Sequence, residues 1–331
     1  MQPAPVLEIQ ANFVQGGLIV VFQGNHNIMD MNGMGHIFEL YASSLRGEPF
    51  TEVEVVAGNQ DRRNIVKLLD PAQLPDMSRY MPTAGLKAPK TPEVQTISSD
   101  VRWVYFHFSA NRLAALKTAA SKPPSKTSNA VPVSWITTDD ALSAWICQKI
   151  LIARSRRLPK VPKAIICRAI NARRFLEPPI AKEYTGHAVT CAYTEVLLDD
   201  PSATNDLSSL AHQMRGDLLA IKSHDIQSFA TKLDSLDDKG MLSFGARLDL
   251  TAFDITISSW SALGVGLVEF GKTLGYPAFA KRPRFDPMES IIYLMPKTLE
   301  GHVDVACCLK DEDIKTLQND ADFEKYGRYI G

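Results

Sequence analysis

Cysteine is scarce in this sequence, and its spacing excludes two common uses of the residue. The 331 residues include five cysteines. This odd number contains no C-x-x-C pair, so neither a disulfide framework nor a zinc site is indicated. No cluster of metal-ligating residues stands out either, and we expect a metal-free protein. A reducing, cytoplasmic location is the expectation that follows.

The sequence also lacks a charge imbalance and a long apolar run. Its formal net charge is −1, which gives no electrostatic footprint for nucleic acid or for an anionic membrane. No apolar run approaches the roughly 20 residues that a membrane-spanning helix needs. Residues 1–5 (MQPAP) lack the basic and apolar regions of a signal peptide. The composition, 45% hydrophobic and 22% charged, is typical of a globular protein with one large domain or two modest ones.

A short strand, a histidine turn and a helix follow one another near the start of the chain. Residues 18–22 form an apolar run that ends in a polar turn with His26, and Asp30 comes four residues later. Apolar residues then recur at steps of three and four over 34–45, which predicts one face of a helix. Histidine can take and return protons near neutrality, because its unperturbed pKa is about 6.5. The ordinary alternative is a hydrogen-bonded structural histidine, since H-x-x-x-D arises by chance in roughly one such sequence in three.

Strands and helices alternate along the whole chain. Residues 6–13 and 18–22 predict a hairpin that turns at Gly16-Gly17 and buries Leu7, Ile9, Ala11 and Phe13 on one face. Further strands are expected over 102–108, 164–170, 253–258, 290–295 and 302–309. Helices are expected over 206–221 and after three caps, Ser109, Thr138 and Asp311. Residues 70–94 are rich in proline and predict a long linker. The alternation predicts an α/β fold.

Five stretches, taken in order, resemble the motifs of one family, the BAHD acyltransferases. They are 26–30 (HNIMD), 138–144 (TDDALSA), 171–187 with its NARR, PP and YTGH segments, 258–260 (SSW), and 269–275 (EFGKTLG). The segments 282–285 (RPRF), 289–290 (ES) and 310–313 (KDED), ahead of the terminal YIG, are similar to the fungal trichothecene 3-O-acetyltransferase group. The resemblance extends from about residue 5 to residue 331.

The resemblance implies a two-domain, chloramphenicol-acetyltransferase-like BAHD architecture with mixed sheets and an active centre in a channel between the domains. In the family a substantial stretch precedes the histidine motif, so this chain is expected to be truncated at its amino end, with an incomplete first domain. We expect that domain to keep residues 1–68, a crossover linker to cover 69–99, and the second domain to cover 100–331, with about 255–275 crossing into the first. A monomer is expected, although the uncovered first domain would leave an apolar face open for association.

The resemblance further implies acyl transfer from acetyl-CoA, or another acyl-CoA, as co-substrate to an alcohol. His26 would be the general base. The Ser258 hydroxyl and the Trp260 indole N–H would face the oxyanion. Asp30 would turn away from His26 and pair with Arg173. The ordinary alternatives are a solvated arginine, a solvent-facing serine and a tryptophan packed in the core.

Three more residues would support the site. Gly33 would permit a tight start of the helix beside the histidine. Glu269 and Gly271 stand in a motif that begins with aspartate in the family and holds the fold by an ion pair, so a longer acidic side chain is expected to form that pair here. The residues that contact coenzyme A cannot be assigned from the sequence.

The expected acceptor is a small-molecule alcohol, a hydroxylated fungal secondary metabolite such as a trichothecene-like sesquiterpenoid. Two rival hypotheses remain. The chain is either an inactive relative that binds a metabolite without turning it over, or an acyl-handling enzyme such as a condensation domain. A condensation domain usually carries paired histidines followed by Asp-Gly, whereas Asn25 precedes His26 and Met31 follows Asp30 in this chain.

Overall fold

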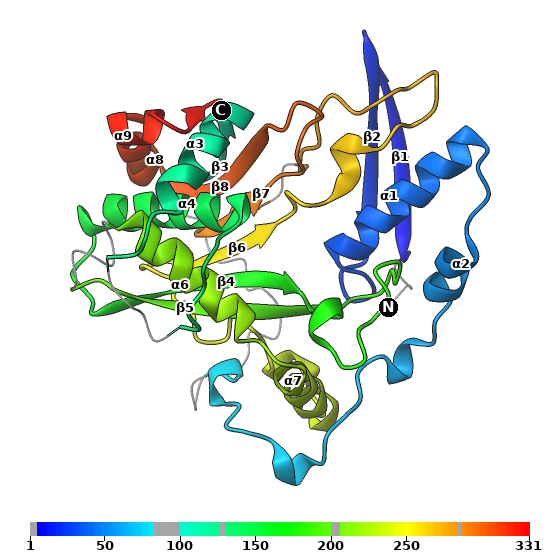
Figure 1. Ribbon diagram of the computed structural model, residues 1–331, viewed down its shortest axis with the longest axis horizontal. Coiled ribbons are helices and arrows are strands. Elements are labelled where there is room, and N and C mark those ends of the chain that lie inside the picture. Colours follow the sequence, from blue (N-terminus) through cyan, green and yellow to red (C-terminus); the bar gives the residue numbers. More distant parts are fainter. Residues whose placement is uncertain (1–4, 83–99, 126–129, 200–205, 284–285) are drawn as a thin grey trace.

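The computed structural model describes residues 5–82, 100–125, 130–199, 206–283 and 286–331 (Figure 1). Within these ranges the chain forms a two-stranded sheet and a separate seven-stranded sheet. Figure 1 shows the two-stranded hairpin on one side of the molecule and the last helices of the chain on the other. The larger sheet contains parallel and antiparallel pairs, so the predicted α/β fold with mixed sheets is confirmed.

The amino-terminal unit is a hairpin followed by two helices. Strand β1 (Leu7–Val14) pairs antiparallel with β2 (Gly17–Gly24), and helices α1 (Met31–Arg46) and α2 (Glu52–Gly58) follow. Gly16 turns the hairpin with a φ of 84°, a left-handed conformation that glycine adopts at little steric cost. The predicted hairpin is therefore confirmed.

The expected burial of one face of β1 is wrong. Phe13 is 86% exposed and Ile9 is 42% exposed, and Ala11 is also exposed. Leu7, by contrast, packs with the apolar cluster around α1. In the described part of the chain only the end of the hairpin nearest α1 is covered. The alternation in the sequence therefore reflects the pleat of the strand and not a buried face.

Helix α1 packs its apolar face against a segment from far along the chain. Met34 and Phe38 are buried together with Met29 of the preceding turn and with Val265. Val265 belongs to η6 (Gly264–Leu267), a 3₁₀ turn. The chain that follows the strand ending at residue 259 therefore reaches the amino-terminal unit.

Seven strands form the large sheet. They are β3 (Val101–Phe108), β4 (Lys163–Asn171), β5 (Val189–Leu197), β6 (Ile255–Ser259), β7 (Ile291–Leu294), β8 (Val303–Lys310) and β9 (Arg328–Tyr329). Their order is β5-β4-β6-β7-β8-β3-β9. Strand β6 runs parallel to both of its neighbours, and the other pairs are antiparallel. The strand that carries the SSW stretch therefore lies inside the sheet.

Helices pack on this sheet around one core. They are α3 (Ala110–Ala120), α4 (Thr138–Ser155), α6 (Leu207–Leu219), α8 (Asp311–Gln318) and α9 (Ala321–Glu324). Helix α7 (Ser223–Ser235) places its Ile226 in a second, smaller apolar cluster. Leu116, Ile146 and Met214, from α3, α4 and α6, share the core with Phe106 and Ile255 of the sheet. Helix α4 is buried along most of its length. None of the described helices is long and apolar enough to cross a bilayer.

The helix caps differ in detail from the expectation. The cap of α4 is Thr137 and not Thr138, because the Thr137 hydroxyl accepts from the Asp140 N–H and the Asp140 carboxylate accepts from Thr137. Helix α8 starts at Asp311 itself, and Ser109 precedes α3 without a side-chain capping bond. A terminal helix residue is set by where the backbone leaves its extended conformation, which composition alone does not fix.

The described part of the expected linker contacts helix α7 and the turn that follows it. After η1 (Arg62–Asn64) it forms two 3₁₀ turns, η2 (Pro71–Gln73) and η3 (Ser78–Tyr80). The Leu69 N–H donates to Thr231 Oγ1 of α7 at 2.8 Å. The Tyr80 carbonyl accepts from Ser243, just after η5 (Lys239–Met241). Residues 83–99 of the linker, and 284–285 of the RPRF stretch, lie outside the described residues.

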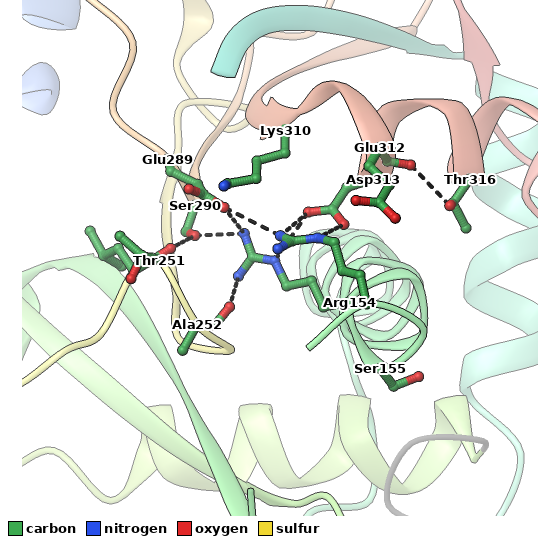
Figure 2. A network of polar contacts seen from close by, with 12 residues as sticks. Arg154, Ser155, Thr251, Ala252, Glu289, Ser290, Lys310, Glu312, Asp313 and Thr316 are labelled. Atoms are coloured by element: carbon green, nitrogen blue, oxygen red, sulfur yellow. Dashed lines mark hydrogen bonds and ion pairs between the residues drawn. The ribbon is translucent and has the colours of Figure 1, made fainter. Parts of the chain in front are cut away.

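A buried polar network fastens α4 to α8 (Figure 2). Arg154 is fully buried, and its Nε lies 3.4 Å from Asp313 Oδ2. The same guanidinium donates to Ser290 Oγ at 2.6 Å and to the Ala252 carbonyl at 2.9 Å. Arg157 adds bonds of 2.6 and 2.7 Å to the Asp313 carboxylate. Because a buried charge is tolerated only when it is paired and hydrogen-bonded, each member of this network depends on the others.

We expect Asp313→Asn to lower the free energy of unfolding by about 3–5 kcal/mol, because it leaves the guanidinium groups of Arg154 and Arg157 with Glu289 as their one remaining carboxylate in the described network, at 3.7 and 3.4 Å. Urea denaturation measures the loss. The control is Lys163→Met, which removes an exposed pair with Glu195 at 2.7 Å and should cost at most about 1 kcal/mol. Equal losses in the two variants would contradict the role of the network.

Candidate active site

The His26 turn lies between β2 and α1. The Asn25 carbonyl accepts from the N–H groups of Ile28 and Met29, at 2.9 and 3.0 Å, which closes the turn. His26 is exposed, whereas Met29 and Asp30 are buried. The turn therefore presents its histidine to solvent and directs its aspartate inward.

Asp30 and Arg173 form a buried ion pair. Arg173 lies in η4 (Ala172–Phe175), directly after β4, and each of the two residues is 2% exposed. Two guanidinium nitrogens donate to the two carboxylate oxygens, at 2.9 and 3.0 Å. The carboxylate also accepts from the backbone N–H groups of Gly33 (2.8 Å) and Ala188 (2.7 Å). The alternative of a solvated arginine is therefore wrong, and Asp30 also caps α1.

The electrostatics of Asp30 follow from these bonds. Burial works to raise the pKa of the Asp30 carboxyl, but the hydrogen bonds and charge of Arg173, with the two backbone donors, outweigh it and leave the pKa below its ordinary value. The carboxylate is therefore ionised throughout the neutral range. Because both of its oxygens are occupied, it is not placed to orient an imidazole.

The same ion pair fixes the segment before β5. The Arg173 guanidinium donates to the carbonyls of Tyr184 (3.2 Å) and Gly186 (2.5 Å). The His187 N–H donates to the Ile28 carbonyl at 3.0 Å. Residues 184–188 are thus bound to the histidine turn, and they bring a second histidine to it.

His187 is a neighbour of His26 that sequence reasoning missed. The two ring centroids lie 5.3 Å apart, with the planes tilted by 54°. Removal of water by the surrounding protein lowers the pKa of His187, His26 and Arg173 add to the effect, and Asp30 opposes it. The only signal in the sequence was the YTGH segment, which was assigned to the arginine stretch without a role for its last residue.

Gly33 was expected to permit a tight start of α1, but the structure shows a close approach to another segment at this position. A Cβ on Gly33 would lie 2.1 Å from the Thr185 carbonyl oxygen, far inside van der Waals contact. The first turn of α1 therefore packs directly on the backbone of the 184–188 segment. The glycine allows this close approach between two segments, and it is not required by the backbone angles of the helix start.

Ser258 and Trp260 lie at the end of β6 and contact each other. The Trp260 indole N–H donates to Ser258 Oγ at 3.1 Å. The Trp260 ring packs against Tyr293, with centroids 5.1 Å apart, and the Arg282 guanidinium lies 5.0 Å from the same ring. Across the described residues neither Ser258 nor Trp260 hydrogen-bonds to His26. The structure therefore forms two groupings, one around His26 and one at the end of β6.

Helix α1 links the two groupings. It begins immediately after the histidine turn, and it packs on η6, which starts four residues after Trp260. A Cβ on Gly35 would lie 3.2 Å from the Leu263 side chain. The start of this helix therefore approaches both the arginine segment and the chain that leaves β6.

A cavity of about 350 Å³ lies beside the end of β6. Its wall includes Asp139, which accepts from the hydroxyls of Ser259 and Ser261. A neighbouring cavity of about 380 Å³ shares Lys117 and Lys297 with it. Two ammonium groups thus border a hollow at the edge of the SSW stretch.

The expected ion pair of Glu269 is wrong in detail. Arg46, at the end of α1, donates to the backbone carbonyl of Glu269 and forms its ion pair with Glu48 at 2.5 Å. Within the described chain the Glu269 carboxylate has no ion-pair partner. Gly271 has a φ of 86° and forms a tight turn with Gly275. The motif therefore contacts α1 through its backbone and its turn.

The mixed sheet, the buried H-x-x-x-D aspartate and the SSW strand end define an acyltransferase class of protein. The chain belongs to the Transferase family, whose model matches residues 1–324, and the predicted BAHD membership is confirmed. The O-acetyltransferase dmxR13 of Cryptosporiopsis sp. (strain 8999) is 36% identical over 338 residues, which cover 99% of this chain and 70% of that protein. The trichothecene 3-O-acetyltransferase TRI101 of Fusarium sporotrichioides is 34% identical over 333 residues, which cover 99% of this chain and 69% of that protein.

Comparison with solved structures supports the same family. F. graminearum TRI101, complexed with coenzyme A and deoxynivalenol, is similar with a TM-score of 0.89 and 31% identity. The match covers 100% of this chain and 71% of that one. The expected two-domain architecture is consistent with this similarity, and the expected amino-terminal truncation stays a prediction.

We expect Asp30→Asn to destabilise the protein by about 3–5 kcal/mol at pH 7, because Arg173 stays buried without its counter-charge. The folded-state pKa of Asp30 is lowered, so its stabilisation is present above about pH 4 and is lost as the pH falls through the folded pKa. Urea unfolding at pH 7 and at pH 3 measures this, and the gap between wild type and variant should narrow at the lower pH. A gap that widens on acidification would show that the pair does not hold the turn.

Proposed function

We propose that this protein is an acyl-CoA-dependent O-acyltransferase, and specifically an O-acetyltransferase with His26 as its general base. The observation that carries the proposal is the turn in which an exposed His26 stands beside a buried, fully bonded Asp30. The named activities of the relatives support it, since these are O-acetyltransferases, and one of them was solved with coenzyme A. We take the acceptor to be a hydroxylated fungal secondary metabolite such as a trichothecene-like sesquiterpenoid.

His26 would act on the acceptor hydroxyl. As the alcohol oxygen attacks the thioester carbonyl, the neutral imidazole takes the hydroxyl proton. The carbon–sulfur bond then breaks, the acyl–oxygen bond remains, and the imidazolium returns its proton to the leaving thiolate. Exposure of His26 at the turn fits this role, because the acceptor must approach the ring from solvent.

Asp30 and Arg173 would act by position alone. Every carboxylate oxygen of Asp30 is engaged by Arg173 or by backbone N–H groups. The ion pair thus fixes the backbone of the turn and, through it, the base. Gly33, which permits the contact with residue 185, belongs to the same support.

The Ser258 hydroxyl would stabilise the oxyanion, and Trp260 would act through it, because the indole N–H that was expected to face the oxyanion is engaged by Ser258. The indole N–H donates to Ser258 Oγ, which polarises the hydroxyl and leaves its proton free to point outward. One well-placed donor of this kind contributes about 2.7–4 kcal/mol to an acyl-transfer transition state. Substrate binding between α1 and β6 would bring this hydroxyl and His26 to the same carbonyl.

The cavity beside β6 would receive part of the acyl-CoA. Lys117 and Lys297 border it, and ammonium groups suit the phosphates of coenzyme A. We also retain the proposed division into residues 1–68, 69–99 and 100–331. The packing of Val265 with Met34 and Phe38 supports a segment of about 255–275 that crosses to the first domain.

We expect His26→Ala to lower kcat by about 10²–10⁴-fold, the usual contribution of a general base. The assay is release of free thiol from acetyl-CoA in the presence of a panel of sesquiterpenoid and polyketide alcohols. The control is His224→Ala on α7, which should keep the wild-type rate. Unchanged rates in His26→Ala would remove the base from this proposal, and a folded wild type without alcohol-dependent release would favour the metabolite-binding alternative.

We expect Lys117→Ala and Lys297→Ala each to raise KM for acetyl-CoA by roughly fivefold, which corresponds to about 1 kcal/mol for an exposed charge pair. The value of kcat should stay within about twofold, since the charges bind donor and transition state alike. Lys163→Ala, at an exposed position on β4, is the matched control. A KM unchanged in both variants would place the donor elsewhere.

A further inference from the structure

Two histidines from distant parts of the sequence meet at the proposed site. His26 comes from the turn after β2, and His187 immediately precedes β5. Their ring centroids are 5.3 Å apart and their planes are tilted by 54°. Neither imidazole has a hydrogen bond within the described chain, so the contact between the rings is available to constrain the orientation of both.

The backbone around His187 is held firmly to the His26 turn. The His187 N–H donates to the Ile28 carbonyl at 3.0 Å, and the next N–H, of Ala188, donates to Asp30 at 2.7 Å. Two consecutive residues are thus bonded to the turn that carries the base. The His187 ring is therefore presented to His26 by a rigid segment.

The fold itself makes little use of the His187 ring. Part of the side chain is exposed to solvent, and the ring has no hydrogen bond in the described part of the chain. A histidine that serves packing or backbone satisfaction is buried or bonded, as His36 is buried in α1 and His107 is bonded to Asp304. The ring contact with His26, without a hydrogen bond in the described chain that would explain the side chain, points to a role at the site.

The charges that face this pair leave His187 neutral. The charge of Arg173 acts on His187. Arg62 donates to the Ile28 carbonyl of the His26 turn at 2.8 Å. Asp30 is the one carboxylate among the groups that act on His187, and its oxygens are engaged by Arg173 and by the backbone. Loss of water lowers the pKa of His187, and the charges of His26 and Arg173 lower it further. A neutral ring can pack against His26 without repelling the proton that His26 receives.

We propose that His187 is a positioning residue for His26, because its ring packs against the base and limits the orientations that the base can adopt. This inference rests on the proposed function, in which His26 is the base. A base held in one orientation keeps its nitrogen aligned with the acceptor hydroxyl, and a misplacement of about 1 Å can cost up to 10²-fold in rate.

The first test separates contact from catalysis. The Cε1 resonance of His26 is followed through a pH titration by NMR of the full chain, without substrates. His187→Asp places a negative charge at the ring contact, which favours the imidazolium of His26, so the titration midpoint should rise by about one pH unit. His224→Asp introduces the same charge on α7 and should leave the midpoint unchanged. An unchanged midpoint in His187→Asp would overturn the inference, whatever the activity of the protein.

The second test measures positioning. His187→Ala removes the ring and should lower kcat about tenfold, with KM for acetyl-CoA within about twofold, because the misoriented base affects the transition state more than donor binding. His187→Phe restores a neutral ring of similar size and should recover most of kcat. A loss of kcat in both variants, or in neither, would overturn the positioning role. Failure of the proposed function would be seen separately, as an unchanged rate in His26→Ala.

Discussion

The buried ion pair between Asp30 and Arg173 is the interaction on which the rest of the site depends. It joins the turn after β2 to the turn after β4, two segments more than a hundred residues apart in the sequence, and it also starts α1 and holds residues 184–188. Two buried charges contribute little net stability, because their desolvation offsets their attraction. Their value here is geometric, since only one arrangement of the two turns satisfies both groups.

Helix α1 transmits this arrangement to the other half of the site. Its first turn is fixed by Asp30 and lies against the Thr185 backbone, and its middle packs on the chain that leaves β6. Any shift of the helix along its axis would break the first contact or open the second. Helix α1 therefore fixes the position of the histidine turn relative to the SSW strand end, and no hydrogen bond between these two described segments contributes.

Local signals in the sequence predicted much of this structure, whereas contacts across the chain were harder to predict. The hairpin, the body of α1 and strands β3, β4, β6, β7 and β8 follow from periodicity and turn residues. Strands β5 and β9 and the first residue of α1 were not predicted. The pairing of Asp30 with Arg173 required a family resemblance, because no pattern links two residues so far apart. The proximity of His187 to His26 arises only when the strands are ordered. Burial of the hairpin was wrongly expected, because alternation reports a pleat without saying what covers it.

The site separates groups that must stay charged from groups that must change charge. The lowered pKa of Asp30 keeps its carboxylate ionised well below the pH at which an imidazole takes up a proton. The charge of the Asp30–Arg173 pair therefore does not change over the pH range in which an imidazole titrates. His187, with its pKa also lowered, would stay neutral beside the proposed base and would add no repulsion when His26 takes up a proton. Because the Asp30–Arg173 pair stays ionised across the neutral range, the proposed proton transfer at His26 would leave the support of the turn unchanged.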